Sequence, residues 1–533
     1  MNEFASPRAG RREWIGLAVL ALPCLIYSMD LTVLNLAVPH LSADLRPTSA
    51  QLLWIVDVYG FVIAGSLVTM GTLGDRIGRR RLLLIGAAAF GGASVVAAFS
   101  TSAEMLIATR ALLGLAGATL APSTLSLIRA MFLDAEQRTF AIGVWVASFS
   151  AGAAIGPLLG GLLLAHFWWG SVLLLGVPVM VLLLILGPRL LPEHCDPNAG
   201  RLDLRSAGLS LAAVLAGVYG LKQAAENGVG WSPLLFLAAG VAVGAAFVSR
   251  QRRLDDPLID VRLFRLPAFS FALIAGLLTI FVAMGAFLYI AQYLQLALEL
   301  SPMRAGLWTL PWAGGLIAGS MLAPVLARRW DPMAVVASGF ALAASGLGVL
   351  TQVGTGSGLG LLVGGMIVVS LGIALVIPIT TEMVVGSAPA ERAGAASAMS
   401  ETATELGASL GIAVLGAIGT AVYRSDVAAG VPAGLPADVV ESARDTLGGA
   451  VALAHELPPE VGSALIEAAR DAFVRGMHIT AAISAVLAVG MVVGALAWQR
   501  KTRGAIQGAS DEIDVEFEGA DIESGLLHDQ VTS

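Results

Sequence analysis

The chain has 533 residues, of which 57% are hydrophobic and 13% charged, and its mean hydropathy is +0.82. Soluble proteins carry about 25% charged residues, so this composition excludes an ordinary soluble domain and predicts a polytopic membrane protein. The net charge of -7 does not favour nucleic acid, because the acids collect in the C-terminal tail and one long loop. Cys24 and Cys195 imply no disulfide framework, and the histidines lack metal-ligand spacing. The sequence therefore predicts no metal, no cofactor and no nucleic-acid partner.

Apolar runs of about 18 residues or more follow one another along the chain. The first comes after Arg8, Arg11 and Arg12 and is too long for a cleavable signal, so we expect an uncleaved span. The predicted spans lie near residues 14–36, 52–73, 82–100, 105–127, 139–164, 170–187, 206–222, 232–249, 269–291, 305–327, 333–351, 358–380, 401–423 and 476–498. This pattern predicts an all-α fold with about fourteen transmembrane helices.

The lysines and arginines predict the orientation of these spans. With the N-terminus in the cytoplasm, about 23 of them lie on the inner side, about 7 outside and one within a span. The inner clusters are Arg76 with Arg79 to Arg81, Arg250 with Arg252 and Arg253, Arg328 with Arg329, and Arg500 with Lys501 and Arg503. One span more or fewer would spoil this bias. We therefore expect both termini in the cytoplasm of a multi-pass protein of the cell membrane.

Polar stretches divide the chain into parts. Residues 188–205 and 250–268 flank spans seven and eight and are interpreted as linkers, while 424–475 form a long outer loop, either a solvated cap or a lid over an exit path. The acidic stretch from Asp511 to Glu523 has a composition typical of disorder. The predicted domains are an N-terminal six-helix half (1–187), a linker with two extra transmembrane helices (188–268), a C-terminal six-helix half (269–498) and an acidic cytoplasmic tail (499–533).

The second span carries a single carboxylate, Asp57. An Asp at the bilayer centre costs roughly 2.5 to 3.5 kcal/mol, so a carboxylate there indicates a functional site. The alternative is an acid near the helix end that reaches the interface. We predict that Asp57 binds a cation or a proton.

The same helix ends in Gly71-Thr-Leu-Gly74-Asp75-Arg76-Ile-Gly78-Arg79-Arg80-Arg81. The glycines permit a tight turn and close helix approach, and Asp75 can accept charge-assisted hydrogen bonds at a helix end. A mere basic anchor would need neither the glycines nor the acid. The segment resembles the loop signature between spans 2 and 3 of the major facilitator superfamily. That resemblance implies two six-helix halves around a midplane cavity, alternating access by rocking of the halves, and a gating role for this loop.

Span 1 contains DLTVLNLAVP from Asp30, which resembles a signature of fourteen-span drug:proton antiporters. Asp30 should face the bundle interior, where it either couples transport to protons or has a purely structural role. Span 4 holds Arg110, the one basic residue predicted within a span. A buried guanidinium needs a carboxylate or several carbonyls. Asp30 and Asp57 are both candidates for that partner.

Span 5 reads AGAAIGPLLGG, which is similar to the antiporter motif of exporters in this superfamily. Its glycines, Gly152, Gly156, Gly160 and Gly161, would let helices touch backbone to backbone, and Pro157 would set a bend. Generic packing is the alternative for any one glycine. This motif favours export over uptake.

Span 13 begins SETATELG, with Glu401 and Glu405 one turn apart on one helical face. Two acids so placed repel unless they are protonated or paired. They are candidates for a proton or cation site. Exposure near the inner end is the alternative, more for Glu401 than for Glu405.

Together the chain resembles efflux pumps for quaternary ammonium compounds and dyes, in the fourteen-span drug:proton antiporter branch. The resemblance implies a monomer that exports lipophilic organic cations in exchange for protons, driven by the proton gradient. Some relatives carry an acid at the position of Leu316, so the handling of dications is open. Aromatic side chains could supply cation-π walls, although membrane interfaces and packing also use them; they are Trp54, Tyr59, Trp145, Tyr289, Tyr293, Trp308 and Trp312.

Two other classes of membrane protein share features with this sequence. An importer or a narrow-specificity exporter of a metabolite shares the fold, and only the motifs of spans 1 and 5 argue against it. A membrane-embedded transferase would need a metal-binding acid cluster, whereas Asp255 and Asp256 sit among arginines in a linker. We therefore expect a transporter and not an enzyme.

Overall fold

The computed structural model describes residues 8–47, 49–193, 203–227, 230–254, 257–300, 302–356, 359–389, 392–430, 443–444, 447–454 and 457–531. Within these ranges some side chains lie outside the description, among them those of Asp57, Pro157 and residues 501–531. Cys195, Asp255 and Asp256 lie outside the described residues altogether. The described residues form helices and connecting turns.

The described part of the chain contains fourteen helical segments long and apolar enough to cross a membrane, which confirms the predicted fold class. The first seven are α1 (Arg11–Leu45), α2 (Ser49–Ile77), α3 (Arg79–Ala98), α4 (Ala103–Gly117) continued by α5 (Leu120–Met131), α6 (Ala135–His166), η1 (Trp169–Leu175) continued by α7 (Gly176–Leu190), and α8 (Leu204–Asn227). The other seven are α9 (Trp231–Gln251), α10 (Pro267–Gln292) continued by η3 (Tyr293–Ala297), α11 (Pro302–Ala327), α12 (Pro332–Leu350), α13 (Leu359–Ser387), α14 (Ala393–Leu410) continued by η5 (Gly411–Leu415) and α15 (Gly416–Gly430), and α18 (Pro459–Val531).

Local sequence signals set several helix starts. The side chains of Ser102, Asp134 and Asp331 accept backbone N–H bonds at the first turns of α4, α6 and α12. Proline, which lacks an N–H and has a fixed φ, begins α10 and α12. A short 3-10 helix, η2 (Val261–Arg265), follows Asp260, whose side chain caps it.

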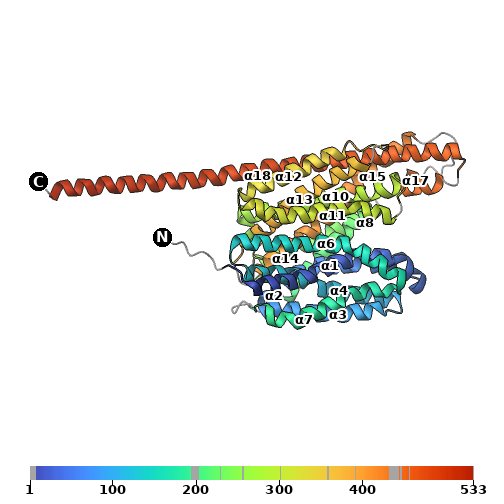
Figure 1. Cartoon of the computed structure of the whole chain (residues 1–533), viewed down its shortest axis with the longest axis horizontal. Helices are drawn as coiled ribbons and strands as arrows, with labels where there is room; N and C mark the ends of the chain where they lie inside the picture. The colour runs from blue at the N-terminus through green and yellow to red at the C-terminus, as the bar shows by residue number, and fades with distance from the viewer. Residues whose placement is uncertain are drawn as a thin grey trace.

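The helices form two bundles with separate hydrophobic cores. One core gathers buried residues mainly from α1 to α7, and we call these helices the N-terminal bundle. Further cores join α10 to α18, the C-terminal bundle. Figure 1 shows the blue and cyan helices of the first bundle beside the yellow to red helices of the second. The α8–α9 hairpin packs on α2 and lies between these two groups in sequence.

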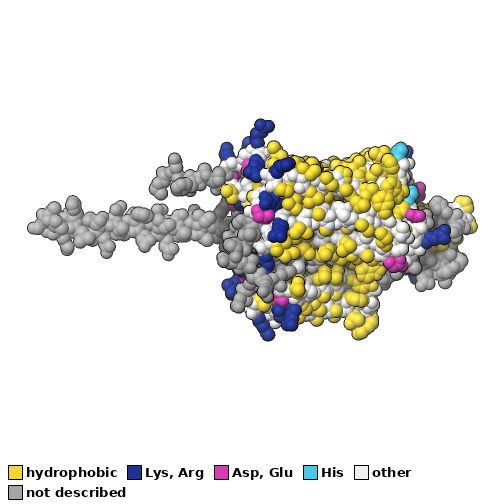
Figure 2. Space-filling model, turned by 90° about the horizontal axis from the view of Figure 1, so that it is seen from below, with side chains coloured by type: hydrophobic (Ala, Val, Ile, Leu, Met, Phe, Trp, Pro, Cys, Tyr) yellow, Lys and Arg dark blue, Asp and Glu magenta, His cyan; other side chains and the backbone are white. Residues whose placement is uncertain are grey.

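The surface matches a protein that crosses a membrane. Figure 2 shows a broad hydrophobic band, with lysines and arginines gathered at one end of the molecule. We call this the basic end. Because α1 starts there and α2 runs back toward it, the turn between α2 and α3, with Arg76 and Arg79 to Arg81, lies at the same end. Figure 1 shows the start of α1 and the C-terminal part of α18 toward the same end. That this end faces the cytoplasm stays a prediction.

Two features of the C-terminal part differ from the expectation. The helix that contains the last span begins at Pro459, because part of the stretch predicted as outer loop buries Leu465, Ala469 and Phe473 along one face of α18. A short helix, α17 (Leu447–Ala454), packs against it. The backbone of α18 also continues through the acidic tail to Val531, where disorder was expected. Extending an existing helix needs no new nucleation, which explains how a polar sequence stays helical.

Candidate functional site

The 71–81 segment joins the two bundles at the basic end. Asp75 is 5% exposed, and its Oδ1 accepts from Arg79 Nε and from the backbone N–H of Gly394, while its Oδ2 accepts from the N–H of Ala395, all at 3.0 Å. Gly394 and Ala395 lie in the first turn of α14, where backbone N–H groups have no partner within the helix. A carboxylate of the N-terminal bundle therefore caps a helix of the C-terminal bundle, and the helix dipole favours its negative charge.

Glycines make this contact possible. A Cβ on Gly71 would lie 2.5 Å from the carbonyl oxygen of Gly394, and one on Gly394 would lie 2.4 Å from Asp75 Oδ1. At Gly78 the backbone adopts φ +105°, a conformation that side-chain-bearing residues rarely adopt, and the Glu193 carboxylate fills the space beside it. The turn thus requires glycine for two separate reasons, close approach and backbone conformation.

Further charged groups reinforce the same end. Arg129, in the last turn of α5, donates through Nη2 to the carbonyl of Ala388 at 2.7 Å and through Nη1 to the carbonyl of Val385, near the C-terminus of α13. Arg138 of α6 pairs with Glu382 of α13 at 2.6 Å. The N-terminal bundle therefore places an anion at the start of α14 and a cation at the end of α13, which suits the dipole of each helix.

A second buried charge cluster lies deeper in the N-terminal bundle. Arg110 of α4 is 1% exposed, and its Nη1 lies 2.5 Å from Oδ2 of Asp30 on α1. Its Nε donates to the carbonyl of Ile55 at 3.2 Å, and its guanidinium carbon lies 4.5 Å from the ring centroid of Tyr59. The sequence left open which acid meets Arg110, and the structure pairs it with Asp30. The side chain of Asp57 lies outside the described part.

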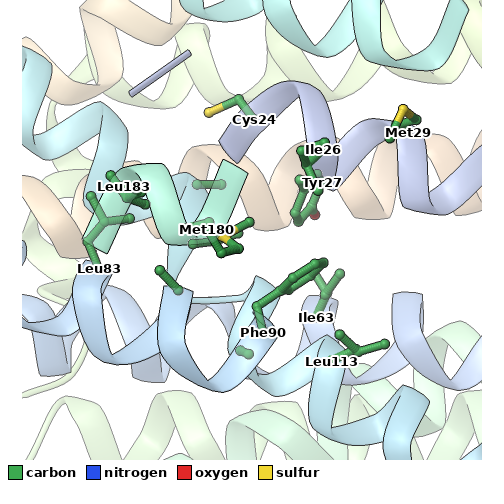
Figure 3. Close-up of a cluster of buried hydrophobic side chains, with 14 of the residues drawn as sticks. Cys24, Ile26, Tyr27, Met29, Ile63, Leu83, Phe90, Leu113, Met180 and Leu183 are labelled. Carbon is green, nitrogen blue, oxygen red and sulfur yellow. The ribbon is translucent and has the colours of Figure 1, made fainter. Parts of the chain in front are cut away.

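The two bundles also meet at Glu405. Its Oε1 accepts a hydrogen bond from the hydroxyl of Tyr27 on α1 at 3.3 Å. The Tyr27 ring lies 6.3 Å, centroid to centroid, from that of Tyr59, whose own buried hydroxyl has no hydrogen-bond partner among the described residues. Figure 3 shows Cys24 and Tyr27 on successive turns of α1 within the buried cluster. A chain of contacts thus runs from Glu405 through two tyrosines to the Arg110–Asp30 pair.

Glu401, one turn before Glu405, is 8% exposed, so the alternative that it is solvent-exposed is wrong. Close packing of α14 against other helices explains its burial. A Cβ on Gly407 would lie 2.4 Å from the carbonyl oxygen of Leu277 on α10. Counting from the basic end, the order along the interface is Asp75 with the start of α14, then Glu401, then Glu405 with Tyr27.

The span-5 glycines differ in how closely they approach α1. A Cβ on Gly152 would lie 2.2 Å from the carbonyl oxygen of Leu25, and one on Gly156 would lie 2.5 Å from Thr32 Oγ1, so both press α6 against α1. A Cβ on Gly161 would meet none of the described atoms within 4 Å. Gly160 is buried. The close approach that the motif predicts therefore falls beside the stretch of α1 that carries Tyr27 and Asp30.

The seven aromatic residues do not gather in one place. Trp54 is 43% exposed and stacks on Tyr219 of α8 at 6.2 Å. Trp145 donates to Thr124 Oγ1 at 2.9 Å, and Tyr289 and Tyr293 donate to backbone carbonyls of Leu415 and Gly354. Trp308 is partly exposed, and Trp312 packs on Phe287. Of the seven, Tyr59 alone contacts the Arg110–Asp30 pair in the contacts described.

Sequence reasoning missed Tyr27. Its signal was present, because Tyr27 precedes Asp30 by three residues and therefore lies on the same face of α1. It also missed Arg129, Arg138 and Glu382, whose partners lie some 250 residues away in the chain. Within the described residues, no group of three or more His, Cys, Asp or Glu could hold a metal ion.

Comparison with known proteins identifies the family. The sequence profile of the Major Facilitator Superfamily matches residues 20–412. The chain belongs to this superfamily. Its members are transporters and not enzymes, and this chain is a multi-pass protein of the cell membrane.

Individual relatives cover nearly the whole chain. It is 45% identical to the multidrug efflux pump LfrA of Mycolicibacterium smegmatis over 92% of this chain and 97% of that protein. It is 37% identical to the methyl viologen resistance protein SmvA of Salmonella typhimurium, over 90% of this chain and 98% of that one. The crystal structure of the human organic anion transporter MFSD10 superposes with a TM-score of 0.60 at 15% identity, covering 90% and 99% of the two chains. That last likeness concerns the fold alone.

Proposed function

We propose that this superfamily member is a proton-coupled multidrug efflux antiporter for lipophilic organic cations. The observation that carries the proposal is the 45% identity to a multidrug efflux pump over 92% of the chain. The geometry supports it, because ionisable groups lie buried between and within the bundles where a transport path would run. The proposed partners are cationic small molecules, protons and the bilayer, with a functional monomer and no cofactor beyond the proton gradient.

In the proposed mechanism, the bundles rock so that the path opens first to one side of the membrane and then to the other. The structure has α2 and α14 joined at the basic end, so it corresponds to a state closed there. Opening that end requires Asp75 to leave the first turn of α14 and Arg129 to leave the end of α13. Both charged groups would then be solvated, which limits the cost of opening.

Exchange of a cation for a proton would use carboxylates. An acid in a low-dielectric site binds either a proton or a cation, so the two compete for one group. Asp30, Asp57, Glu401 and Glu405 are the proposed groups. Moving one charge through 100 mV is worth about 2.3 kcal/mol, roughly fifty-fold in an equilibrium constant, so one or two protons suffice for useful export.

The test is export of ethidium and of methyl viologen from energised cells that express the chain, with and without a protonophore. We expect the protein to lower the accumulation of ethidium and the protonophore to abolish the effect. Methyl viologen, a dication, tests the consequence of Leu316. If neither cation is exported under a proton gradient, the cation-pump proposal fails, and import or narrow-specificity export takes its place.

A further inference from the structure

The α8–α9 hairpin is attached to the N-terminal bundle through α2. Trp54 of α2 stacks on Tyr219 of α8, and a Cβ on Gly65 would lie 2.4 Å from Leu211 Cδ1 of α8. At the basic end the hairpin is closed by Asp203 and Arg250, 2.7 Å apart. This guanidinium holds the pKa of Asp203 well below its usual range, so the pair stays ionised near neutral pH. The hairpin therefore has a fixed base at the end where the bundles meet.

Gln251 turns the chain back at that base. Its side chain is 2% exposed; Nε2 donates to Ser206 Oγ at 2.8 Å, and Oε1 accepts from the backbone N–H of Leu258 at 2.8 Å. A buried amide left without these bonds would be costly. The segment that follows, residues 257–265, is called the connector here. Gln251 thus sets the direction in which the connector leaves the hairpin.

The first part of the connector lies against α2. Leu258 is 1% exposed and packs with Val68 of α2 and Phe247 of α9, and its carbonyl accepts from Thr72 Oγ1 at 3.2 Å. Thr72 comes one turn before Asp75 on the same helix. This part of the connector therefore contacts α2 beside the carboxylate that reaches α14.

The second part of the connector lies against α13 and α14. Asp260 Oδ2 lies 3.5 Å from Nη1 of Arg392, the residue that immediately precedes α14. Leu263 is buried in a cluster with Val384 of α13 and with Ala396 and Met399 of α14. The connector thus spans the same two helices, α2 and α14, that Asp75 joins.

We propose that the connector is a second latch across the bundle interface, with Gln251 and Asp260 as positioning residues that hold α14 against α2. This proposal rests on the proposed rocking of the bundles. In that motion the two extra helices, α8 and α9, would anchor the connector to the N-terminal bundle. The two polar contacts of the connector differ in exposure. Gln251 is buried, whereas Asp260 and Arg392 are about one-third exposed, so the ion pair with α14 is the weaker polar contact and breaks first when the basic end opens.

The test measures opening at the basic end by the distance between two spin labels. Leu133 in the N-terminal bundle and Trp330 in the C-terminal bundle are each 55% exposed near that end and would be replaced by labelled cysteines, with Cys24 and Cys195 changed to serine. Double electron–electron resonance in lipid nanodiscs then reports the closed and open populations. The full chain is used throughout.

We expect Asp260→Asn to raise the open population roughly two- to five-fold, the range for a partly exposed ion pair. Asp260→Arg should raise it further, and adding Arg392→Asp should bring it back toward the wild type. The matched control is Asp426→Asn, which removes the carboxylate of another exposed pair, with Arg475, within the C-terminal bundle. It should leave the distances unchanged.

The outcomes separate this proposal from the one before it. If Asp260→Arg leaves the distances at wild-type values, the connector is not a latch, whatever the transport data show. If Asp260→Arg opens the basic end and the reversed pair closes it, the latch stands even where no cation is exported. Gln251→Leu, which should also open that end, covers the case in which an Asp260 variant fails to fold.

Discussion

The buried ion pair of Arg110 and Asp30 allows a quantitative prediction of the free energy of unfolding. Arg110→Met would leave Asp30, which is 7% exposed, without the guanidinium 2.5 Å away. Breaking a buried pair by removing one partner typically costs 3 to 5 kcal/mol, because an uncompensated charge remains. Replacing both partners by apolar residues is often neutral, so Asp30→Val with Arg110→Met should lie within about 1 kcal/mol of the wild type.

The assay is equilibrium unfolding in mixed micelles titrated with SDS, followed by tryptophan fluorescence. The matched control is Arg475→Met, which breaks the more exposed pair with Asp426 and should cost less than about 1 kcal/mol. If Arg110→Met unfolds as the wild type does, or if the double variant is no more stable than the single one, the reasoning on this pair is refuted.

The same variants decide between the two roles left open for Asp30. If Asp30 couples transport to protons, the double variant regains stability but does not export ethidium. Export at the wild-type rate by the stable double variant would leave Asp30 a structural role only. Stability and transport must therefore be measured on the same preparations.

Three further predictions concern the interface. Asp75→Asn should raise the ratio of open to closed molecules roughly thirty-fold or more in the spin-label assay, since hydrogen bonds to a charged group are worth about 1.5 to 3 kcal/mol each. Asp134→Asn, which removes only the charge of a helix-capping carboxylate within one bundle, should not change that ratio, and equal effects of the two variants would contradict the gate. Tyr27→Phe removes one hydrogen bond across the interface, about 0.5 to 1.5 kcal/mol, and should slow ethidium export by about two- to tenfold while expression is retained; an unchanged rate would remove Tyr27 from the path. Gly152→Leu should abolish folded protein on size-exclusion chromatography because it collides with the α1 backbone, whereas Gly161→Leu, in open space, should be tolerated.

Sequence predicted the fold well because lipid imposes a strong constraint. A segment that crosses the bilayer must satisfy its backbone internally and expose apolar side chains, so hydropathy alone locates the helices. Hydropathy failed to predict a helix that packs on protein outside the lipid-facing part of the chain. The stretch from Pro459 to Phe473 is too polar for a lipid-facing span, yet its apolar face packs on protein.

The site was predicted less completely, because pairing depends on how helices face one another. Hydropathy, together with the free-energy cost of burying a charge, showed that Asp30, Arg110 and Asp75 need partners. It did not show which residues those partners are. The contacts of Asp75 with Gly394 and Ala395 involve backbone groups, which carry no side-chain signal in sequence. The aromatic residues show that nearness in sequence does not predict a shared site. Trp54 lies on α2 near Asp57 in sequence, but its ring stacks on Tyr219 of α8.

Proton-coupled export of lipophilic cations is tested most directly by following both species at once. In proteoliposomes with an acidic lumen and a pH-sensitive dye inside, added ethidium should enter while protons leave, and Asp57→Asn should abolish both movements. The two fluxes should start together and stop together when a protonophore collapses the gradient. Ethidium uptake with no proton release, or uptake that survives the protonophore, would contradict it.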